Sequence, residues 1–352
     1  MATQNFVIKI SELIEQQLFS KKSGYYKIKN PIGKSQDFIT APEISQIFGE
    51  IMAVYLLELS QNSVNKIALI EMGAGHGTWL SDILQTIENL ANKSQKIAQE
   101  FLKKTEIFIV ETSPQLQKIQ QQNLTKYKIK WCENFAEFLT ESSGEVYFIS
   151  NELFDCFAID QYVKTTKGWR ERLIEFSDKQ NLSNPRFVIS ETDCNNFVEQ
   201  QIGKPLALIS PFQAVYEYSK DARDFMQQLS SAIYLRGGLA INIDYGYSNY
   251  DFANTLQTIK NHQKIPFLEG FKDGDITALV DFFALDNIAK KNQLKTSLIS
   301  QREFLLSLGA ESRLESLIKK NPKIADNLQN DFDRLINPSQ MGDLFKVHII
   351  WK

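Results

Sequence analysis

The sequence contains little cysteine and little histidine. Its three cysteines (Cys132, Cys156 and Cys194) lie far apart in a chain of 352 residues and form no Cys-x-x-Cys pair. They therefore predict neither a disulfide framework nor a cysteine zinc site, and they fit free thiols in a reducing compartment. The three histidines are equally scattered, so the sequence predicts no metal centre with histidine ligands.

Long apolar runs and an excess of positive charge are also missing. No apolar stretch approaches the ~20 residues that a membrane-spanning helix requires. The first residues do not combine a basic segment with an apolar one, so we expect no secretory signal. Nucleic-acid-binding surfaces are usually basic, whereas the formal net charge of this chain is −3. We therefore expect a cytoplasmic protein without a membrane span and without a nucleic-acid partner.

The sequence does contain an unusual glycine pattern. An apolar run over residues 67–70 ends in Glu71, and glycines follow at alternate positions, Gly73, Gly75 and Gly77. Glycine adopts positive φ angles without steric cost and lets a ligand approach the backbone. The pattern therefore predicts a buried strand, a tight turn over which a ligand binds, and a helix.

The spacing of these glycines indicates the kind of ligand. A dinucleotide-binding turn has the pattern Gly-x-Gly-x-x-Gly and holds a pyrophosphate. Here the third glycine comes one residue earlier, and Glu71 would repel a pyrophosphate but suits a cofactor with an ammonium group. This pattern at the end of a strand is typical of class I S-adenosylmethionine (SAM) methyltransferases. A glycine turn without a ligand is the alternative.

A second acidic residue ends a second apolar run. Residues 107–110 are β-branched or aromatic, and Glu111 and Thr112 follow them. A carboxylate at the end of the neighbouring strand can bind both ribose hydroxyl groups of a nucleoside. We therefore predict that Glu111 and Thr112 bind SAM together with Glu71 and the three glycines. Alternatively, Glu111 caps the helix that starts near Ser113, and both roles can coexist.

Strands and helices alternate through most of the chain. We predict strands near residues 67–71, 107–110, 129–132, 146–150 and 239–244, and helices at 5–19, 42–61, 77–90, 95–104, 113–124 and 221–235. Such alternation predicts an α/β fold with a doubly wound, mostly parallel sheet and helices on both faces. The alternating pattern of residues 344–351 predicts a last strand that closes the sheet.

The same sequence patterns divide the chain into segments. Residues 1–62 are expected to form an N-terminal helical and lid segment, and residues 63–352 the core that binds the cofactor. Within this core we expect a β-rich insertion at 160–205, where short strands alternate with polar turns. A helical addition on the substrate side is expected at 250–336.

Motifs along nearly the whole chain are shared with one family. The most distinctive is the segment 37–50, and shorter matches lie at 24–26, 31–33, 71–78, 110–114, 151–155, 244–247, 255–257, 275–278, 301 and 341–347. Together they resemble the MidA-like class I SAM-dependent methyltransferases, relatives of the methyltransferase that assists assembly of mitochondrial respiratory complex I. The resemblance implies a class I fold and SAM as the cofactor. From the mitochondrial relative it implies symmetric dimethylation of an arginine in a respiratory complex subunit, and a mitochondrial matrix location if the source is eukaryotic.

The segment after the strand at 146–150 carries two candidate catalytic residues. Glu152 and Asp155 are three positions apart and face the same side if this segment forms a helical turn. An arginine side chain is cationic at neutral pH, as is the sulfonium of SAM, so carboxylates are needed to orient the guanidinium and offset its charge. We predict that Glu152 and Asp155 bind the substrate cation. Alternatively, both only stabilise the start of a helix.

Residues before the glycine turn are candidates for a lid on the substrate side. Asp37, Thr40, Pro42 and Glu43 belong to the segment 24–50, which we expect to cover the cofactor. The alternative is that Asp37 and Thr40 are turn and cap residues of the following helix.

Two residues at the end of a later strand complete the predicted site. Asp244 ends the strand predicted at 239–244 and is expected to face the ligand crevice, and Tyr245 follows it and is expected to line the substrate path. The alternative is a strand end with a tight turn at Gly246.

Other functions are compatible with the same motifs. One is a SAM-dependent methyltransferase that acts on a small molecule or an RNA, although the acidic composition disfavours RNA. Another is a SAM-binding assembly chaperone with little catalysis. The glycine turn and the acidic residues after the strands favour catalysis.

Overall fold

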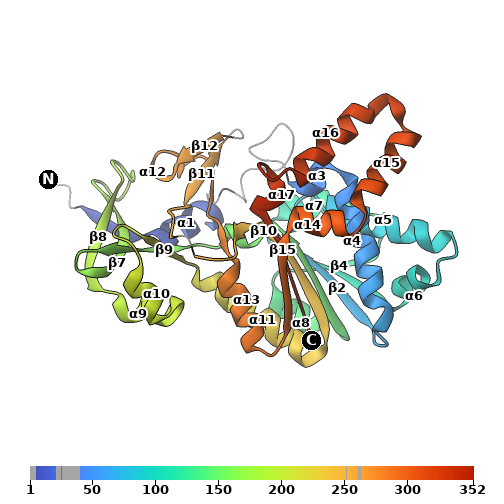
Figure 1. The fold of residues 1–352 in the computed structure, drawn as a ribbon, viewed down its shortest axis with the longest axis horizontal. Helices are drawn as coiled ribbons and strands as arrows, with labels where there is room; N and C mark the ends of the chain where they lie inside the picture. Colours follow the sequence, from blue (N-terminus) through green and yellow to red (C-terminus); the bar gives the residue numbers. More distant parts are fainter. Residues whose placement is uncertain (1–4, 21–24, 26–39, 251, 261–262) are drawn as a thin grey trace.

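The computed structural model describes residues 5–20, 25, 40–250, 252–260 and 263–352. Its elements form two parts that lie side by side along the long axis of the molecule (Figure 1). One part is built on a large sheet, and the other on a smaller sheet that includes the N-terminal strand. Within these described ranges, no helix is long and apolar enough to cross a membrane.

An eight-stranded sheet forms the centre of the larger part. Its strands lie in the order β15 (Lys295–Ser300), β16 (Phe345–Trp351), β10 (Gly238–Tyr247), β5 (Glu145–Asn151), β2 (Ile67–Met72), β3 (Thr105–Val110) and β4 (Ile129–Cys132), and β14 (Val280–Asp281) pairs with β10. Strands β10, β5, β2, β3 and β4 are parallel, while β16 is antiparallel to both of its neighbours. The predicted strands and the mostly parallel sheet are confirmed.

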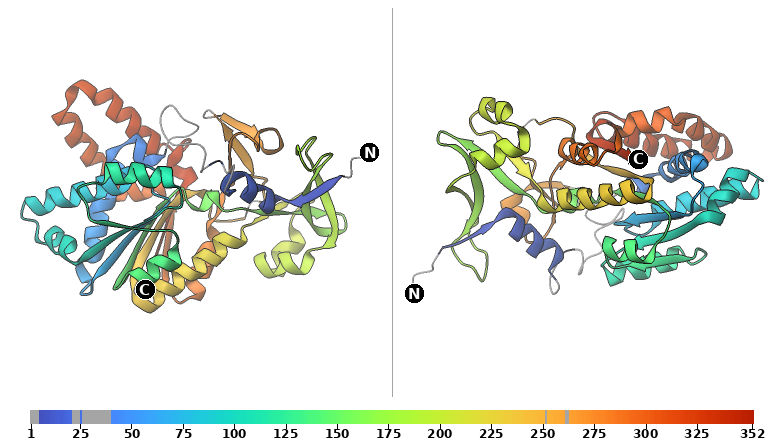
Figure 2. Two further views of the ribbon diagram at one scale, coloured as in Figure 1. Left: turned by 180° about the vertical axis from the view of Figure 1, so that it is seen from behind. Right: turned by 90° about the horizontal axis from the view of Figure 1, so that it is seen from below.

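Helices cover both faces of this sheet (Figure 2). One face packs against α4 (Gln46–Leu59), α5 (Thr78–Asn92) and α6 (Lys96–Lys104), and the other against α8 (Phe135–Glu141), α11 (Lys220–Arg236) and α13 (Phe282–Lys291). Successive strand residues alternate between the two faces, so Leu69 belongs to the first core and Ile70 to the second. Residues 67–70 are all fully buried, as expected for a parallel strand covered on both faces. The doubly wound arrangement is therefore confirmed.

The helix predicted at 42–61 is interrupted near its start. It consists of α3 (Ala41–Ile44) and α4, which are separated by Ser45 in an extended conformation. The Ser45 hydroxyl accepts a hydrogen bond from the Ile47 N–H at 3.3 Å and so caps α4. After the break α4 packs along α5, while α3 contacts both α5 and α16.

The smaller part contains three strands within the range expected to be β-rich, and it corrects the N-terminal prediction. Its sheet contains β1 (Phe6–Lys9), β7 (Gly168–Phe176), β6 (Asp160–Thr165) and β9 (Val215–Tyr218), with β8 (Arg186–Asp193) also paired to β7. The helix expected over 5–19 is wrong for its first turn, because residues 6–9 pair with 173–176 of β7 and only α1 (Ile10–Phe19) is helical. The strand β9 was not predicted.

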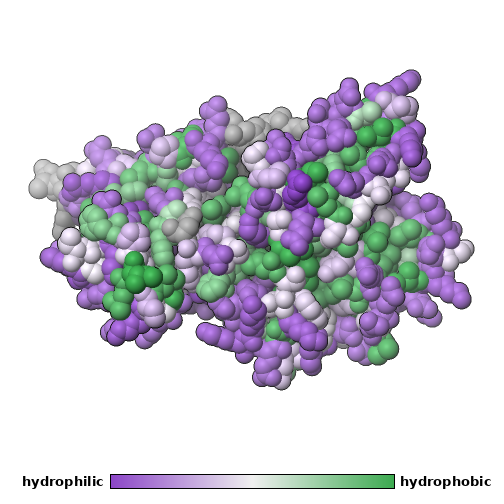
Figure 3. Space-filling view, viewed as in Figure 1, coloured by the Kyte–Doolittle hydropathy of each residue, from purple (hydrophilic) through white to green (hydrophobic). Residues whose placement is uncertain are grey.

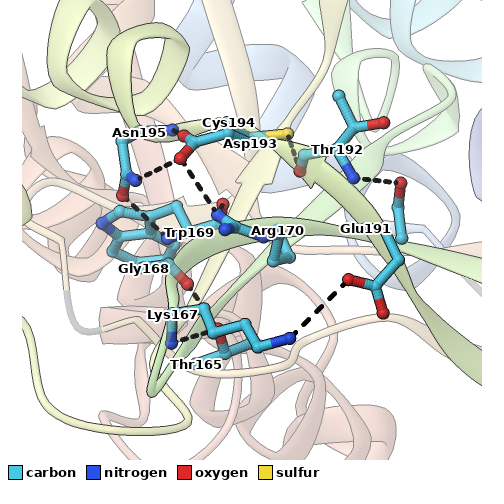
Figure 4. Close-up of polar contacts among 11 residues, drawn as sticks. Thr165, Lys167, Gly168, Trp169, Arg170, Glu191, Thr192, Asp193, Cys194 and Asn195 are labelled. Carbon is cyan, nitrogen blue, oxygen red and sulfur yellow. Dashed lines mark hydrogen bonds and ion pairs between the residues drawn. The ribbon is translucent and has the colours of Figure 1, made fainter.

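Polar contacts fix the turn between β6 and β7 (Figure 4). Gly168 has a φ of +96°, and a Cβ there would lie 2.5 Å from the side chain of Asn195 at the start of α9 (Asn195–Ile202). The Asn195 Oδ1 accepts a hydrogen bond from the Trp169 N–H at 2.9 Å, and the Asp193 Oδ1 accepts one from the Asn195 N–H at 2.8 Å. These contacts stabilise the insertion itself.

The smaller part also carries an apolar patch on its surface (Figure 3). Leu208 and Ile209 at the end of α10 (Lys204–Ile209) are 60% and 77% exposed, and Phe212 is 64% exposed. The patch lies on the smaller part, away from the large sheet.

The segment expected to be helical at 250–336 contains several strands. A three-stranded sheet of β11 (Gln257–Lys260), β12 (Gln263–Pro266) and β13 (Asp275–Thr277) precedes β14, α13 and β15. The segment is mainly helical only after β15, in α14 (Gln301–Ser307), α15 (Ala310–Lys320) and α16 (Ala325–Ile336). The last strand predicted at 344–351 is confirmed as β16, but it does not lie at the edge of the sheet. β16 pairs with β10 on one side and β15 on the other, so β15 forms the edge.

Candidate active site

A cavity of about 500 Å³ opens at the carboxyl ends of the parallel strands. The chain order of the strands reverses between β2 and β5, and ligands of open α/β sheets bind at this point. The volume is in the usual range for a small-molecule site. Its lining includes Glu15, Phe19, Thr40, Pro42, Glu43, Glu71, Gly73, Gly75, His76, Thr78, Trp79, Glu111, Thr112, Glu133, Asn151, Glu152, Cys156, Phe157 and Asp221.

The predicted glycine turn forms one wall of this cavity. Gly73, Gly75 and Gly77 have φ angles of +73°, +52° and +78°, which side-chain-bearing residues rarely adopt. Gly73 and Gly75 line the cavity, whereas Gly77 lies behind it at the start of α5. A Cβ on Gly77 would lie 2.9 Å from the Leu124 Cδ1. The turn therefore requires glycine for its backbone and for the helix that packs behind it.

Glu71 brings a buried carboxyl group to the cavity. It is 3% exposed, and its Oε2 has no hydrogen-bond partner. Burial raises the pKa of Glu71 to about 8, and a hydrogen bond from the Leu80 backbone N–H opposes this effect. A buried acceptor without a partner costs free energy, and an ammonium group would satisfy it. The Oε2 atom therefore fits a ligand that carries an ammonium group.

Glu111 lines the cavity at the end of the next strand. Its Oε1 accepts a hydrogen bond from the Ser113 N–H at 2.8 Å, and its Oε2 accepts one from the Gln120 side chain at 3.2 Å. Burial raises the pKa of Glu111, while these hydrogen bonds lower it. Each carboxylate oxygen can accept another hydrogen bond, so Glu111 can hold the helix start and still fit a ribose. Thr112 lies beside it in the lining.

Two residues that the sequence analysis did not identify support the glycine turn. On α7 (Pro114–Asn123), the fully buried Gln120 donates a hydrogen bond to the Gly75 carbonyl oxygen at 2.9 Å and accepts one from the Trp131 indole at 3.0 Å. Asn123 donates to the His76 carbonyl oxygen at 3.0 Å. Gln120 and Asn123 are three residues apart, so both lie on one face of the helix. Only the tertiary structure shows what that face contacts.

The predicted lid residues are only partly described. Thr40, Pro42 and Glu43 line the cavity, and Asp37 lies outside the described residues. The Glu43 Oε1 accepts a hydrogen bond from the Thr78 hydroxyl at 2.6 Å and lies 3.3 Å from the His76 Nδ1. These contacts attach α3 to the start of α5. A role as a lid stays a prediction.

Glu152 lies at the cavity in an unusual conformation. Its φ of +52° is left-handed, and such strain in a residue with a side chain is most common at functional sites. Its Oε1 accepts a hydrogen bond from the Asn151 Nδ2 at 3.1 Å. Burial and the negative charge of Asp155 raise the pKa of Glu152 to about 8, although hydrogen bonds from Asn151 and the Ala41 backbone lower it.

Asp155 does not share this cavity with Glu152. It is buried, and it accepts hydrogen bonds from the hydroxyl groups of Tyr245 and Thr277, the latter at 3.1 Å. Burial raises the pKa of Asp155, and these hydrogen bonds lower it. The two predicted catalytic residues are therefore near each other, but only Glu152 reaches the cavity.

Asp244 and Tyr245 also lie behind the cavity rather than in its lining. The fully buried Asp244 accepts hydrogen bonds from the N–H groups of Phe154 at 2.9 Å and Asp155 at 3.1 Å. Burial and the negative charge of Asp155 raise the pKa of Asp244 well above its ordinary value. Asp244 thus orders the loop after β5. The alternative of a tight turn at Gly246 is wrong, because β10 continues through this residue.

The ionisable side chains that line the cavity are predominantly acidic. Seven carboxyl groups line it, from Glu15, Glu43, Glu71, Glu111, Glu133, Glu152 and Asp221. Among the described residues, no lysine or arginine lines it. A site with this lining favours cationic ligands.

Comparison with known proteins agrees with this geometry. The family of S-adenosyl-L-methionine-dependent methyltransferases matches residues 50–300. The chain is similar to the protein arginine methyltransferase NDUFAF7, mitochondrial, of Danio rerio, with 30% identity over 96% of this chain and 82% of that protein. The protein of the same name from Homo sapiens is 29% identical over 96% of this chain and 78% of its own length.

The fold is similar to that of a Burkholderia thailandensis protein whose crystal structure contains S-adenosyl-homocysteine. The TM-score is 0.81 at 22% sequence identity, and the similarity covers 98% of this chain and 88% of that one. The expected class I fold is thus confirmed. SAM is the cofactor, and the glycine turn, Glu71 and Glu111 fit it. This chain therefore belongs to the family of S-adenosyl-L-methionine-dependent methyltransferases.

Proposed function

We propose that this enzyme is a protein arginine N-methyltransferase that forms symmetric dimethylarginine. The observation that carries the proposal is the lining of the cavity, which has seven carboxyl groups and, within the described part of the chain, no lysine or arginine. The relatives named protein arginine methyltransferase support the same acceptor.

The carboxyl groups outnumber those that the cofactor alone requires. Glu71 and Glu111 stand beside the glycine turn, which leaves Glu152 at the end of β5 and exposed acidic residues elsewhere in the lining. Glu15 on α1 and Asp221 at the start of α11 are close enough that partial burial and the charge of Asp221 raise the pKa of Glu15. A bound cation would relieve this repulsion. The cavity therefore favours a cationic acceptor over a neutral or anionic one.

Glu152 is the residue that we propose to bind the acceptor guanidinium. SAM supplies the methyl group when it is bound, and the protein has to align the acceptor nitrogen with it. Such positioning can lower a barrier by about 7–11 kcal/mol. A carboxylate pairs with a guanidinium through two parallel hydrogen bonds, and a nearby cation favours the ionised form of Glu152 despite its burial. Asp155, held by Tyr245 and Thr277, acts in this proposal by positioning the loop.

The proposal requires a protein as partner. A respiratory complex subunit is the partner that the family resemblance implies, and it stays a prediction. The vertebrate relatives are named mitochondrial, while the expected cytoplasmic location of this chain also stays a prediction.

The test is methyl transfer from labelled SAM to matched peptides that contain either arginine or lysine, with mass spectrometry of the products. We expect methylarginine only. Glu152→Gln should lower kcat about 100-fold, the usual loss of one electrostatic contact at the reacting group, and should leave the affinity for S-adenosyl-homocysteine unchanged. Glu191→Gln on β8, where the side chain is 94% exposed, is the matched control.

Other results of this assay would contradict the proposal. Label in lysine, in RNA or in a small molecule would assign another acceptor. SAM binding without transfer to any acceptor would favour an assembly chaperone. A Glu152→Gln variant with the wild-type rate would remove Glu152 from the reaction.

A further inference from the structure

The end of β5 carries a polar group that the proposed function leaves unused. Asn151, the last residue of β5, lines the cavity and is 8% exposed. Its Oδ1 has no hydrogen-bond partner. Buried acceptors without partners are rare in folded proteins because they cost free energy. The Oδ1 atom of Asn151 is therefore a candidate for contact with a ligand.

The orientation of this amide is determined by its neighbour. The Asn151 Nδ2 donates a hydrogen bond to the Glu152 Oε1 at 3.1 Å. When a bound cation keeps Glu152 ionised, rotating the amide by half a turn would place the Oδ1 atom against the carboxylate, with two acceptors and no proton between them. Glu152 thus keeps the amide nitrogen on its own side and leaves the oxygen for another donor.

Asn151 lies beyond the part of the sheet that holds Glu71. In the pairing of β2 with β5, Glu71 is opposite Ile149, so Asn151 is two residues nearer to the carboxyl end. This is about 6–7 Å along the strand. Asn151 therefore lies beside Glu152, which we propose to bind the acceptor, and farther along the strand than Glu71, whose carboxyl group fits the cofactor ammonium.

We propose that Asn151 determines specificity for the acceptor by accepting a hydrogen bond from one guanidinium nitrogen while Glu152 binds another. This inference rests on the proposed function. A guanidinium presents five N–H donors in a rigid plane, so it can use two acceptors on adjacent residues. An ammonium is a compact point charge without this fixed geometry. Asn151 therefore favours arginine over lysine.

The test measures binding of two small cations, ethylguanidinium and n-butylammonium, to the full chain saturated with S-adenosyl-homocysteine. Titration calorimetry should show tighter binding of ethylguanidinium to the wild type. Asn151→Leu should weaken ethylguanidinium about tenfold, the usual effect of one hydrogen bond to a charged group, and should change n-butylammonium little. Asn151→Asp retains the oxygen and should retain the preference.

The calorimetric test includes a matched control variant, and three of its possible results would contradict the inference. The control is Asn89→Leu on α5, an exposed asparagine whose Oδ1 accepts from Gln85 at 3.2 Å. Equal binding of the two cations to the wild type would overturn the inference. An equal loss in Asn151→Asp and Asn151→Leu would show that Asn151 acts only through Glu152. Weaker S-adenosyl-homocysteine binding with an unchanged cation preference would assign the Oδ1 atom to the cofactor.

The inference and the proposed function fail in different ways. If the wild type prefers ethylguanidinium but methylates no arginine, the binding site stands and the proposed function is wrong. If it methylates arginine and Asn151→Leu keeps the same selectivity for arginine over lysine peptides, the function stands and the role of Asn151 is wrong.

Discussion

Replacing Glu71 by glutamine should stabilise the ligand-free protein at neutral and alkaline pH while it weakens cofactor binding. Glu71 is 3% exposed and its Oε2 has no partner. Burial raises its pKa from 4.5 to about 8. Between these two pH values the folded protein keeps a proton that the unfolded chain has released. Stability therefore falls as the pH rises through this range and is constant above it.

The size of the effect follows from the pKa difference. Each unit corresponds to about 1.4 kcal/mol, so the wild type loses roughly 4 kcal/mol of stability between pH 5 and pH 8, because the unfolded chain releases a proton that buried Glu71 retains. Glutamine has nearly the same shape and cannot ionise. The free energy of unfolding of Glu71→Gln, relative to the wild type, should increase by this amount over the same pH range.

Urea unfolding at pH 5, 6, 7 and 8 measures this difference, with Glu191→Gln on the exposed strand β8 as the control. Titration calorimetry with S-adenosyl-homocysteine should show affinity at least about tenfold weaker in Glu71→Gln, because a charge-assisted hydrogen bond is lost. A stability difference that does not change with pH would refute the ionisation argument. Unchanged affinity would refute the role of Glu71 at the cofactor.

Three other substitutions test the support of the site. Gly77→Val should lower the free energy of unfolding by about 1–3 kcal/mol through backbone strain alone, and by more because its side chain would collide with Leu124. Thermal unfolding with and without S-adenosyl-homocysteine measures the loss of stability in the free and the ligand-bound protein. Gln120→Leu should weaken S-adenosyl-homocysteine binding about tenfold, because the carbonyl of the glycine turn and Glu111 lose a donor, and calorimetry showing unchanged affinity would contradict this role. Tyr245→Phe should lower kcat and destabilise the protein by about 1–2 kcal/mol. It should not weaken cofactor binding, because Tyr245 contacts Asp155 and does not line the cavity. A raised Kd for S-adenosyl-homocysteine would contradict this prediction.

Features that depend on neighbouring residues in the chain were predictable. The turn at residues 73–77 requires positive φ angles that glycine adopts most readily. The fully buried run of residues 67–70 is apolar on both faces, which is typical of a central parallel strand. Local conformation and burial determine these features, so the glycine turn that lines the cavity could be located from sequence.

Predictions failed where the partner of a segment lies far away in the sequence. Residues 6–9 have helical spacing but form a strand because residues 173–176 offer an open edge. Residues 295–300, within the segment expected to be helical, pair with 346–351 at the end of the chain. Local patterns do not show the hydrogen-bonding edge that decides between helix and strand.

The acceptor side of the site shows the same division between sequence and structure. The sequence by itself determined that acidic residues follow β5, that Asp244 lies near the carboxyl end of β10, and that a glycine turn ends β2. Only the tertiary structure decided that Glu152 reaches the cavity, that Asp155 is bonded to Tyr245 behind it, and that Gln120 supports the turn. The reason is physical: spacing along the chain sets which residues are neighbours on one element, whereas hydrogen bonds between elements set which of them a ligand can contact.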